Sequence, residues 1–368
     1  MPFMVLMNIF IRMGAHMLVG PDLQDKWTAM SFEYLPVFVK ASRKVGAVYS
    51  DWTRWLAPLV DADVKAVKRT RRKAADIIAP IIQARLYELT HSTGKDKKQH
   101  QDAVQWLLEE HRSRGRTPSA DELAQNLLVM TVSSTHQTTM TSLWILFDLI
   151  DHPDSLGEIR EEISRVERTL DNGVWTHRAL GELKILDSFM TESMRFHAFT
   201  QSKPLPFHLP PRHSTNTTNN PPSTATVNRM VMAPFTFKDG LSLPEGTQLS
   251  FPTQQYSRDS SVHSDPDVFD PKRHLRKRQD KETSDPDGGN RYHFASTADT
   301  LIWGSGPHAC PGRFFVGDAL KLIFVRMLMG YDFKYPEDKK PAAGTPHKIM
   351  TNPDVTMPVL FKEKKDST

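Results

Sequence analysis

Hydrophobic positions recur at helical spacing through most of the first half of the chain. Apolar side chains that return every three or four residues form one face of an amphipathic helix. The helices that this pattern predicts span residues 3–19, 26–46, 62–92, 100–113, 120–152, 154–168 and 176–197. One more helix is predicted from about Gly312 to Met329, after a long interval without helical periodicity.

The first predicted helix is apolar but interrupted. Arg12 and His16 break it, and no uncharged run reaches the roughly 18–20 residues that a membrane span requires. We therefore expect a buried helix that begins within a domain.

The longest predicted helix, residues 120–152, is apolar on nearly every side and should be buried. Ser119 and Glu122 stand at capping-box spacing at its start, and no Gly or Pro interrupts it. Its centre, Ser133–Thr139, is a run of hydrogen-bonding or titratable side chains, which a core helix normally avoids. Two interpretations stay open: a polar group faces this run, or its hydroxyls bond back to helix carbonyls at a solvated kink.

Turn and strand signals replace the helical pattern later in the chain. Pro, Asn, Ser and Thr dominate residues 202–224, which we expect to form a disordered insertion. Two or three short strands are predicted within 235–252, separated by two Gly-containing turns, and a meander rich in Pro and charge should follow over 265–290. Weak strands are predicted near 331–335 and 355–361. The fold class is therefore mainly α with small β-sheets, α+β.

Composition adds a few constraints. With 39% hydrophobic and 24% charged residues the chain is ordinary globular material, and a formal charge of +4 does not indicate a nucleic-acid partner. The basic run from Lys65 to Lys73 fits a solvated helix face better than contact with an anionic membrane or an acidic partner. The single cysteine, Cys310, excludes an internal disulfide and favours a reducing, intracellular setting.

The segment around Cys310 carries the strongest chemical signal. Trp303-Gly-Ser-Gly-Pro-His-Ala-Cys-Pro-Gly312 brackets the sulfur with glycines, and the last predicted helix follows directly. Glycines allow a tight loop whose amides approach a flat ligand, and a helix amino terminus stabilises negative charge on sulfur. A lone cysteine outside such a context is usually a small buried hydrophobe. Here the context favours a metal-binding thiolate.

This segment resembles the haem-binding loop of the cytochromes P450. The family pattern is an aromatic, two residues, Gly, any residue, Arg or His, any residue, Cys, any residue, Gly. The residues that match it in register are Trp303, Gly306, His308, Cys310 and Gly312. The resemblance implies that these residues bind haem b and that Cys310 is the axial ligand of the haem iron. Trp303 in place of Phe and His308 in place of Arg are variants seen in fungal members.

A second motif of the same family lies upstream. Glu192 and Arg195 are three residues apart and share a helix face, although such a pair alone means little. In the family they form a buried network with an Arg of the meander, and Arg273 at the end of FDPKR stands at the expected place. The resemblance implies that Glu192, Arg195 and Arg273 form a structural triad under the cysteine loop. It covers nearly the whole chain, which implies one P450 catalytic domain over 1–368, of the fungal secondary-metabolism type.

The resemblance also implies a monooxygenase that acts on a small, bulky, apolar metabolite. Such enzymes use O2 and electrons from NADPH-cytochrome P450 reductase, and the full-length proteins lie at the endoplasmic reticulum membrane surface. In the family an acid and a Thr on the long central helix deliver protons. Counted back from His152, these positions fall on His136 and Gln137, and Thr138 follows. His136 is a candidate relay, with Thr138 as the hydroxyl if the helix bulges locally; a satisfied core histidine is the alternative.

Two departures from the family pattern keep other functions open. The insertion adds about twenty residues after the Glu-Arg helix, which we interpret as a retained intron or as a substrate-side loop. The chain also begins well inside the family's pattern, so we expect a member truncated at its amino terminus that lacks the anchor helix. Truncation leaves a non-catalytic haem-binding fragment as one alternative to a monooxygenase. Family members that isomerise or dehydrate substrates without O2 often lack the Thr that Gln137 replaces, so an O2-independent haem isomerase or dehydratase is the other alternative.

Overall fold

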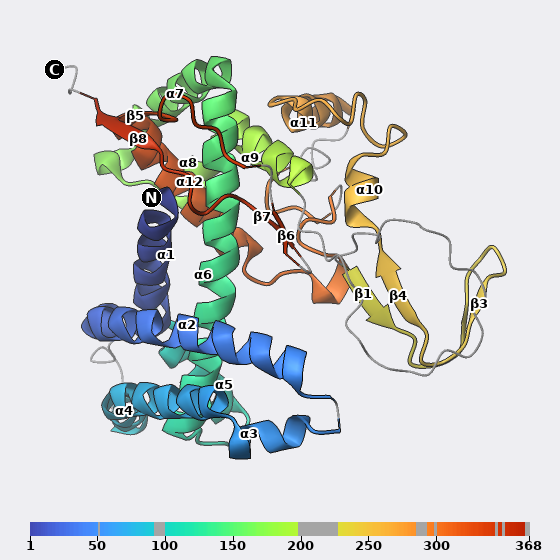
Figure 1. The fold of residues 1–368 in the computed structure, drawn as a ribbon. Helices are drawn as coiled ribbons and strands as arrows, with labels where there is room; N and C mark the ends of the chain where they lie inside the picture. Colours follow the sequence, from blue (N-terminus) through green and yellow to red (C-terminus); the bar gives the residue numbers. More distant parts are fainter. Residues whose placement is uncertain are drawn as a thin grey trace. The chain divides into compact units, whose positions relative to one another are not determined.

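A computed structural model of the chain describes residues 1–50, 52–91, 100–197, 227–284, 293–297, 300–342, 345–347 and 350–364. Helices dominate the described residues, and short antiparallel strand pairs accompany them (Figure 1). The predicted class, mainly α with small β-sheets, is confirmed. The predicted insertion, residues 202–224, lies outside the described residues.

The chain divides into two compact units, and the boundary falls inside its longest helix. The amino-terminal unit is Met4–Thr139, and the carboxy-terminal unit is Met140–Thr368 with Met1–Phe3.

Helices build the described part of the amino-terminal unit. They are α1 (Pro2–Val19), α2 (Gln24–Val48), α3 (Ala57–Val60), α4 (Ala62–His91), α5 (Ala103–Ser113) and the first part of α6 (Ala120–Asp151). The long ones match their predicted spans to within three residues, because each has an apolar face to bury. α2 and α4 lie side by side (Figure 1). The core of this unit includes Leu18, Trp27, Ile78, Leu108 and Leu127.

A buried ion pair links α4 to the start of α5. Both terminal guanidinium nitrogens of Arg85 donate to the two carboxylate oxygens of Asp102, and both side chains are at most 5% exposed. Asp102 also caps α5 by accepting the backbone N–H of Gln105 at 3.0 Å. Gly20, which follows α1 with a φ of 76°, packs against this carboxylate.

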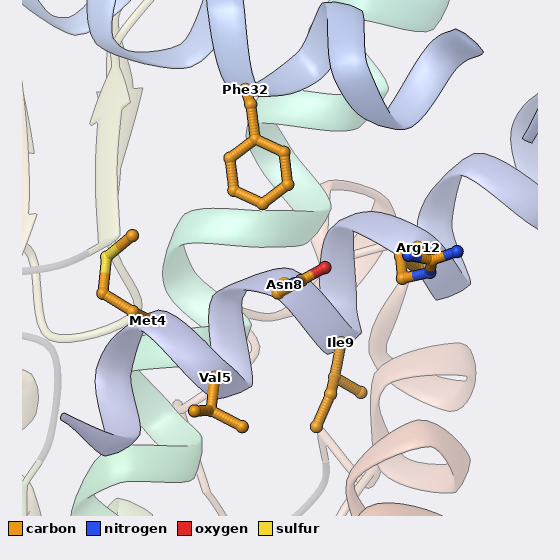
Figure 2. Close-up of a pocket in the computed structure, with 6 residues that line it drawn as sticks. All are labelled: Met4, Val5, Asn8, Ile9, Arg12 and Phe32. Carbon is orange, nitrogen blue, oxygen red and sulfur yellow. The ribbon is translucent and has the colours of Figure 1, made fainter. Parts of the chain in front are cut away.

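One face of α1 is buried and the other is open. Within the described residues, α1 is the helix whose length and mean hydropathy of 1.5 would allow it to cross a membrane, a test that core helices also pass. Leu6, Phe10 and Ile11 are buried, so the expected buried helix is found on one face only. The other face borders an open groove of about 490 Å³, toward which Phe32 points from α2 (Figure 2). The groove is lined by Met4, Val5, Asn8, Ile9, Arg12 and Phe32.

The carboxy-terminal unit combines helices with strand pairs. Its helices are the rest of α6, α7 (Pro153–Glu167), α8 (His177–Gly181), α9 (Lys184–Phe196), α10 (Thr253–Ser257), α11 (Arg273–Ser284) and α12 (Arg313–Gly330). Its antiparallel pairs are β1 (Val227–Met230) with β4 (Gln248–Phe251), β2 (Phe235–Thr236) with β3 (Ser242–Leu243), β5 (Tyr331–Lys334) with β8 (Leu360–Glu363), and β6 (Thr345–His347) with β7 (Met350–Asn352). The strands predicted within 235–252 and at 331–335 are confirmed.

Three predictions of local structure were wrong. The helix predicted over 176–197 is broken after Gly181, because the carboxylate of Glu162 accepts the first N–H groups of α9 and starts a new helix there. The predicted meander contains α11, whose sequence is almost wholly polar and therefore has no hydrophobic period to reveal it. The last strand begins at Leu360 rather than near residue 355.

Candidate functional site

Cys310 lies just before α12 on a loop that closes on itself. Its backbone N–H donates to the carbonyl of Trp303 at 2.8 Å, and Gly304 and Gly306 have φ angles of 74° and 67°. Only glycine adopts such angles without strain, so the tight bend requires both residues. The thiol of Cys310 is partly exposed and forms no disulfide. The loop thus places a partly exposed cysteine directly before the amino terminus of a helix.

The other matched residues lie on the same loop. His308 is exposed at the end of a 3-10 turn, Gly306–His308, and Gly312 directly precedes α12. A Cβ atom at Gly312 would lie 4.0 Å from the Cys310 sulfur, and Arg313 donates to the Cys310 carbonyl at 2.9 Å. The structure therefore brings together the five residues that the sequence singles out: Trp303, Gly306, His308, Cys310 and Gly312.

Contacts from α9 and α12 hold the start of this loop. The indole N–H of Trp303 donates to the carbonyl of Phe294 at 2.5 Å, and the two rings meet edge to face with centroids 5.3 Å apart. The N–H of Phe294 donates to Asp187 of α9 at 2.8 Å, and Asp187 forms an ion pair with Lys321 of α12. Asp187 and Lys321 are both less than 10% exposed. The position of the cysteine loop thus depends on a buried ion pair between two helices.

Sequence analysis missed Asp187, Phe294 and Lys321. A usable signal was present, because Lys321 interrupts an otherwise apolar stretch of α12 and a buried ammonium group requires a partner. The identity of that partner could not be read, since Asp187 is far away along the chain.

Glu192 lies at the centre of a buried ion network. Its two carboxylate oxygens accept hydrogen bonds from Arg195 at 2.8 Å each, and Arg273 of α11 donates to one of them at 3.2 Å. The three side chains are at most 4% exposed, and the ring of His274 lies 3.4 Å from the carboxylate. The guanidinium groups also donate to main-chain carbonyls of Ser257, Ser264, Asp265, Pro266 and Val268. The network thus ties α9 and α11 to the chain between α10 and α11.

The charge of Glu192 is maintained by its partners. Burial by itself raises the pKa of the carboxyl, but the hydrogen bonds from Arg195 and His274 and the charge of Arg195 outweigh burial and hold the pKa well below 4.5. Glu192 is therefore ionised at neutral pH, which the buried arginines require.

His136, Gln137 and Thr138 lie on the part of α6 that belongs to the amino-terminal unit, whereas Cys310 belongs to the other unit. α6 is helical without a break through Ser133–Thr139, so no local bulge shifts Thr138. Neighbouring hydroxyls bond back to helix carbonyls, as in Ser133 to Val129 at 2.8 Å and Thr139 to Thr135 at 2.7 Å. This agrees with the back-bonding interpretation of the polar run, although the helix shows no kink.

His136 is an uncharged imidazole at neutral pH. Burial lowers its pKa from the ordinary value of 6.5, and the positive charge of Arg43 on α2 lowers it further. Thr138 is buried, and His136 and Gln137 are partly buried. The part that these three residues play in catalysis stays a prediction.

Comparison with protein families decides the assignment. The family model described as Cytochrome P450 matches residues 28–204 and 220–358, which include the Glu192 network and the cysteine loop. The chain belongs to the cytochrome P450 family. The matched segments leave out residues 205–219, which fall inside the predicted insertion; its nature stays a prediction.

Three similar relatives of this P450 are fungal proteins. It is 37% identical to cytochrome P450 monooxygenase cheE of Chaetomium globosum, over all of this chain and 66% of the relative. It is 34% identical to cytochrome P450 monooxygenase ccsG of Aspergillus clavatus, over 92% of this chain and 62% of the relative. It is 31% identical to pyrichalasin C-7 hydroxylase of Pyricularia grisea, over 90% and 60%. The chain spans less than two thirds of the length of each of these relatives.

Solved P450 structures share the fold. A cyanobacterial P450, CYP120A1 with bound retinoic acid, aligns with a TM-score of 0.64 at 18% identity, over 98% of this chain and 69% of the other. The haem domain of cytochrome P450DA aligns with a TM-score of 0.65 at 14% identity, over 99% and 68%. At these identities the likeness concerns the fold alone.

Haem b is the cofactor of the P450 family, and the cysteine loop fits it. The loop supplies a thiol that is partly exposed and not engaged in a disulfide, which is the donor that a haem-thiolate site needs. The glycines at 304 and 306 have no side chains, so a planar group can approach the backbone closely at these two positions.

Proposed function

We propose that this P450 is a haem-thiolate monooxygenase that oxidises a bulky apolar metabolite with O2 and electrons from NADPH-cytochrome P450 reductase. The observation that carries this proposal is the partly exposed thiol of Cys310 within a glycine-bent loop at the start of α12. The names of the fungal relatives, which are monooxygenases and a hydroxylase, support the same reaction class.

The residues of the loop have separate roles in this proposal. Cys310 ligates the haem iron, and the bound haem supplies activation of O2. Gly306 and Gly312 keep side chains away from the ligand, while Trp303 and His308 border it. The triad of Glu192, Arg195 and Arg273 acts indirectly, by fixing the main chain between α10 and α11.

Proton delivery is assigned to the centre of α6. His136 is neutral at neutral pH because burial lowers its pKa, so it can accept a proton on one ring nitrogen and donate from the other. Gln137 and Thr138 are the adjacent groups that position water or pass on the proton. The variant His136→Gln, which keeps hydrogen bonding but not proton transfer, should lower turnover more than it lowers haem binding.

The decisive experiment compares the wild-type chain with Cys310→Ser, using Ser305→Ala in the same loop as the control. Purified protein is loaded with haem, reduced and exposed to carbon monoxide, and the absorption spectrum is recorded. Wild type and Ser305→Ala should show the band of a thiolate-ligated ferrous haem, and Cys310→Ser should lack it. An unchanged spectrum in Cys310→Ser would reject Cys310 as the ligand and the proposal with it.

The residues at the centre of α6 favour a second candidate function. Gln137 stands where monooxygenases of the family carry Thr, a position that is often altered in members that isomerise or dehydrate substrates without O2. Product formation from apolar substrates should therefore be assayed with and without NADPH, reductase and O2. If product forms only when NADPH, reductase and O2 are all present, the chain is a monooxygenase. If product forms without them, it is an isomerase or dehydratase. If the chain shows the spectrum of a thiolate-ligated haem but forms no product, it is a haem-binding fragment.

A further inference from the structure

The connection between α5 and α6 contains a short segment that combines arginines with hydroxyl side chains. We call residues 112–119, with the sequence RSRGRTPS, the arginine segment. It contains no acidic residue. Thr117 and Ser119 are exposed, and so are all three arginines. The segment therefore presents two hydroxyl groups to solvent among positive charges.

The main chain of the arginine segment is accessible from Gly115 onward. Gly115 has a φ of 68°, and no atom lies within 4 Å of a Cβ atom built there. The N–H of Arg116 donates to the carbonyl of His111 at 2.9 Å, which ties the segment to the end of α5. Residues 116–119 belong to no helix or strand. Exposed irregular segments of this kind are the ones that a modifying enzyme can bind in extended form.

The arginines of the segment are available to a partner. Arg114 contacts Glu110 at 2.5 Å and Arg116 contacts Glu122 at 3.3 Å, but the two arginine side chains are 68% and 61% exposed. Ion pairs at such exposure contribute little, so the carboxylates of a partner can replace them at low cost.

The spacing of these arginines fits the substrate groove of an arginine-directed protein kinase. Such a groove uses carboxylates to bind the arginines that stand three and five residues before the hydroxyl that is modified. Thr117 has Arg114 and Arg112 at these two positions. Ser119 has Arg116 and Arg114 there. The spacing by itself therefore allows either hydroxyl.

Pro118 decides between the two hydroxyls. It directly follows Thr117, and its side chain is buried. Proline has no N–H and a fixed φ, so a groove that holds its substrate extended through main-chain hydrogen bonds rejects proline directly after the acceptor. Ser119 is followed by Ala120, which imposes no such limit. The geometry therefore favours Ser119.

Another serine, Ser261, also has an arginine three residues before it, but that arginine is engaged. Arg258 donates to Asp267 at 2.9 Å, and its guanidinium lies 3.8 Å from the centroid of the Phe196 ring. The hydroxyl of Ser261 donates to Asp259 at 2.7 Å. Ser261 is therefore a comparison site with similar spacing but without free partners.

We propose that Ser119 is a phosphorylation site for an arginine-directed protein kinase, with ATP and Mg²⁺ as the co-reactants. The Oγ atom of Ser119 attacks the γ-phosphorus of ATP, and an O–P bond forms while the bond to the β-phosphate oxygen breaks. ADP leaves, and the hydroxyl proton passes to the catalytic carboxylate of the kinase. The site is independent of the haem chemistry proposed above.

The start of α6 is suited to hold the phosphate. The Oγ atom of Ser119 already accepts the N–H of Glu122 at 3.1 Å, and Arg116 lies beside it. Asp121 is paired with Arg71 at 3.0 Å, which offsets its charge. A phosphate carries about −1.5 to −2 charges at pH 7 and is stabilised at a helix amino terminus. Phosphorylation should therefore stabilise the start of α6.

The test incubates the full chain with Mg-ATP and a purified kinase that requires arginine three and five residues before its acceptor. Mass spectrometry identifies the modified residue, and initial rates are compared. Wild type, Thr117→Ala and Ser261→Ala should be modified at Ser119 at equal rates, and Ser119→Ala should not be modified. Circular dichroism checks that each variant is folded.

A charge variant tests the role of the arginines. Arg114→Gln/Arg116→Gln should lower kcat/KM for phosphorylation by at least about tenfold, because charged pairs in the substrate groove are lost. Arg72→Gln/Arg178→Gln removes two exposed arginines elsewhere and should leave kcat/KM unchanged.

Thermal denaturation tests the placement of the phosphate. Wild type that is fully phosphorylated should show a Tm a few degrees above that of wild type incubated without ATP. Ser119→Ala treated in the same way should show no difference.

Four outcomes would overturn the proposal. Folded wild type that is not modified would show that the segment is not accessible. Modification of Thr117 or Ser261 at the rate of Ser119 would show that the surroundings do not select the site. Equal rates for wild type and Arg114→Gln/Arg116→Gln would exclude recognition through the arginines. A lower Tm after phosphorylation would show that α6 does not hold the phosphate.

Discussion

Gly20 lies at a position in the amino-terminal unit that has no room for a side chain. Its φ of 76° is in the left-handed region, and a Cβ atom would lie 2.8 Å from a carboxylate oxygen of Asp102. That carboxylate cannot move aside, because Arg85 holds both of its oxygens in a buried pair. Gly20 is thus constrained twice, by its backbone and by its neighbour.

We predict that Gly20→Ala lowers the free energy of unfolding by about 3 kcal/mol. Left-handed backbone costs about 1–2 kcal/mol for a residue with a Cβ atom, and the displaced ion pair adds to this. Gly115→Ala is the matched control, since Gly115 has a φ of 68° but no atom within 4 Å of the added Cβ. Urea denaturation should show the control losing only the backbone cost. Equal losses would mean that contact with Asp102 contributes nothing.

Glu192→Gln should be far more destabilising than loss of a surface carboxylate. The change leaves Arg195 and Arg273 buried without a counter-charge, a loss of about 3–5 kcal/mol. Glu110→Gln, whose partner Arg114 is 68% exposed, should cost less than about 1 kcal/mol. Denaturation midpoints at neutral pH compare the two.

The same variant should change the acid response. The folded pKa of Glu192 is lowered from 4.5, so its contribution is present above that pH and is lost as the pH falls toward the folded value. Wild type should therefore lose stability on acidification below about pH 5, and Glu192→Gln should lack that component. Parallel acid curves for the two proteins would contradict this account.

At the scale of elements, sequence pattern was informative where a helix has one apolar face. The long helices of the amino-terminal unit were predicted to within three residues because burial of a face imposes a 3.6-residue period. α11 was missed because its polar side chains carry no such period. The break between α8 and α9 depends on Glu162, a residue of α7. No sequence pattern near the break predicts it.

The residues of the candidate site also differ in whether the sequence alone could reveal them. The five positions of the cysteine loop are contiguous in sequence, and Glu192 and Arg195 are one helical turn apart, so local spacing and family resemblance were enough to find them. Asp187 and Phe294 are separated by 107 positions, and their hydrogen bond exists only after α9 and the loop have come together. Contacts between residues so far apart in sequence can be identified only once the folded structure is known.

His136 on α6 should make the stability of the folded chain depend on pH. Burial of the His136 side chain, and to a smaller extent the charge of Arg43, lower the pKa of this histidine. The unfolded chain therefore takes up a proton before the folded one as the pH falls through about 6.5. The folded state therefore loses stability in that range. His136→Gln removes this loss, and its denaturation midpoint should fall less than that of wild type between about pH 7.5 and pH 5.5. His91→Gln, an exposed histidine at the end of α4, is the control and should behave as wild type.

At the scale of the molecule, the cofactor should act as a folding ligand. Haem that binds the folded chain and not the unfolded chain stabilises it by about 2.7 kcal/mol at a hundredfold excess over Kd. Cys310 is the only cysteine of the chain, so no other thiolate could replace it as the proposed ligand. The carboxy-terminal unit, which contains Cys310 and the Glu192 network, is the part that such a bond would stabilise directly.

We therefore predict that added haem raises Tm by several degrees in wild type and Ser305→Ala, and by much less in Cys310→Ser. Without haem the three proteins should melt together, because the partly exposed thiol makes no internal bond that serine would lose. Differential scanning calorimetry at several haem concentrations measures both states. A haem-dependent rise of equal size in Cys310→Ser would mean that the cofactor is held without the sulfur. A lower Tm of that variant before haem is added would instead show that Cys310 contributes to packing of the apoprotein.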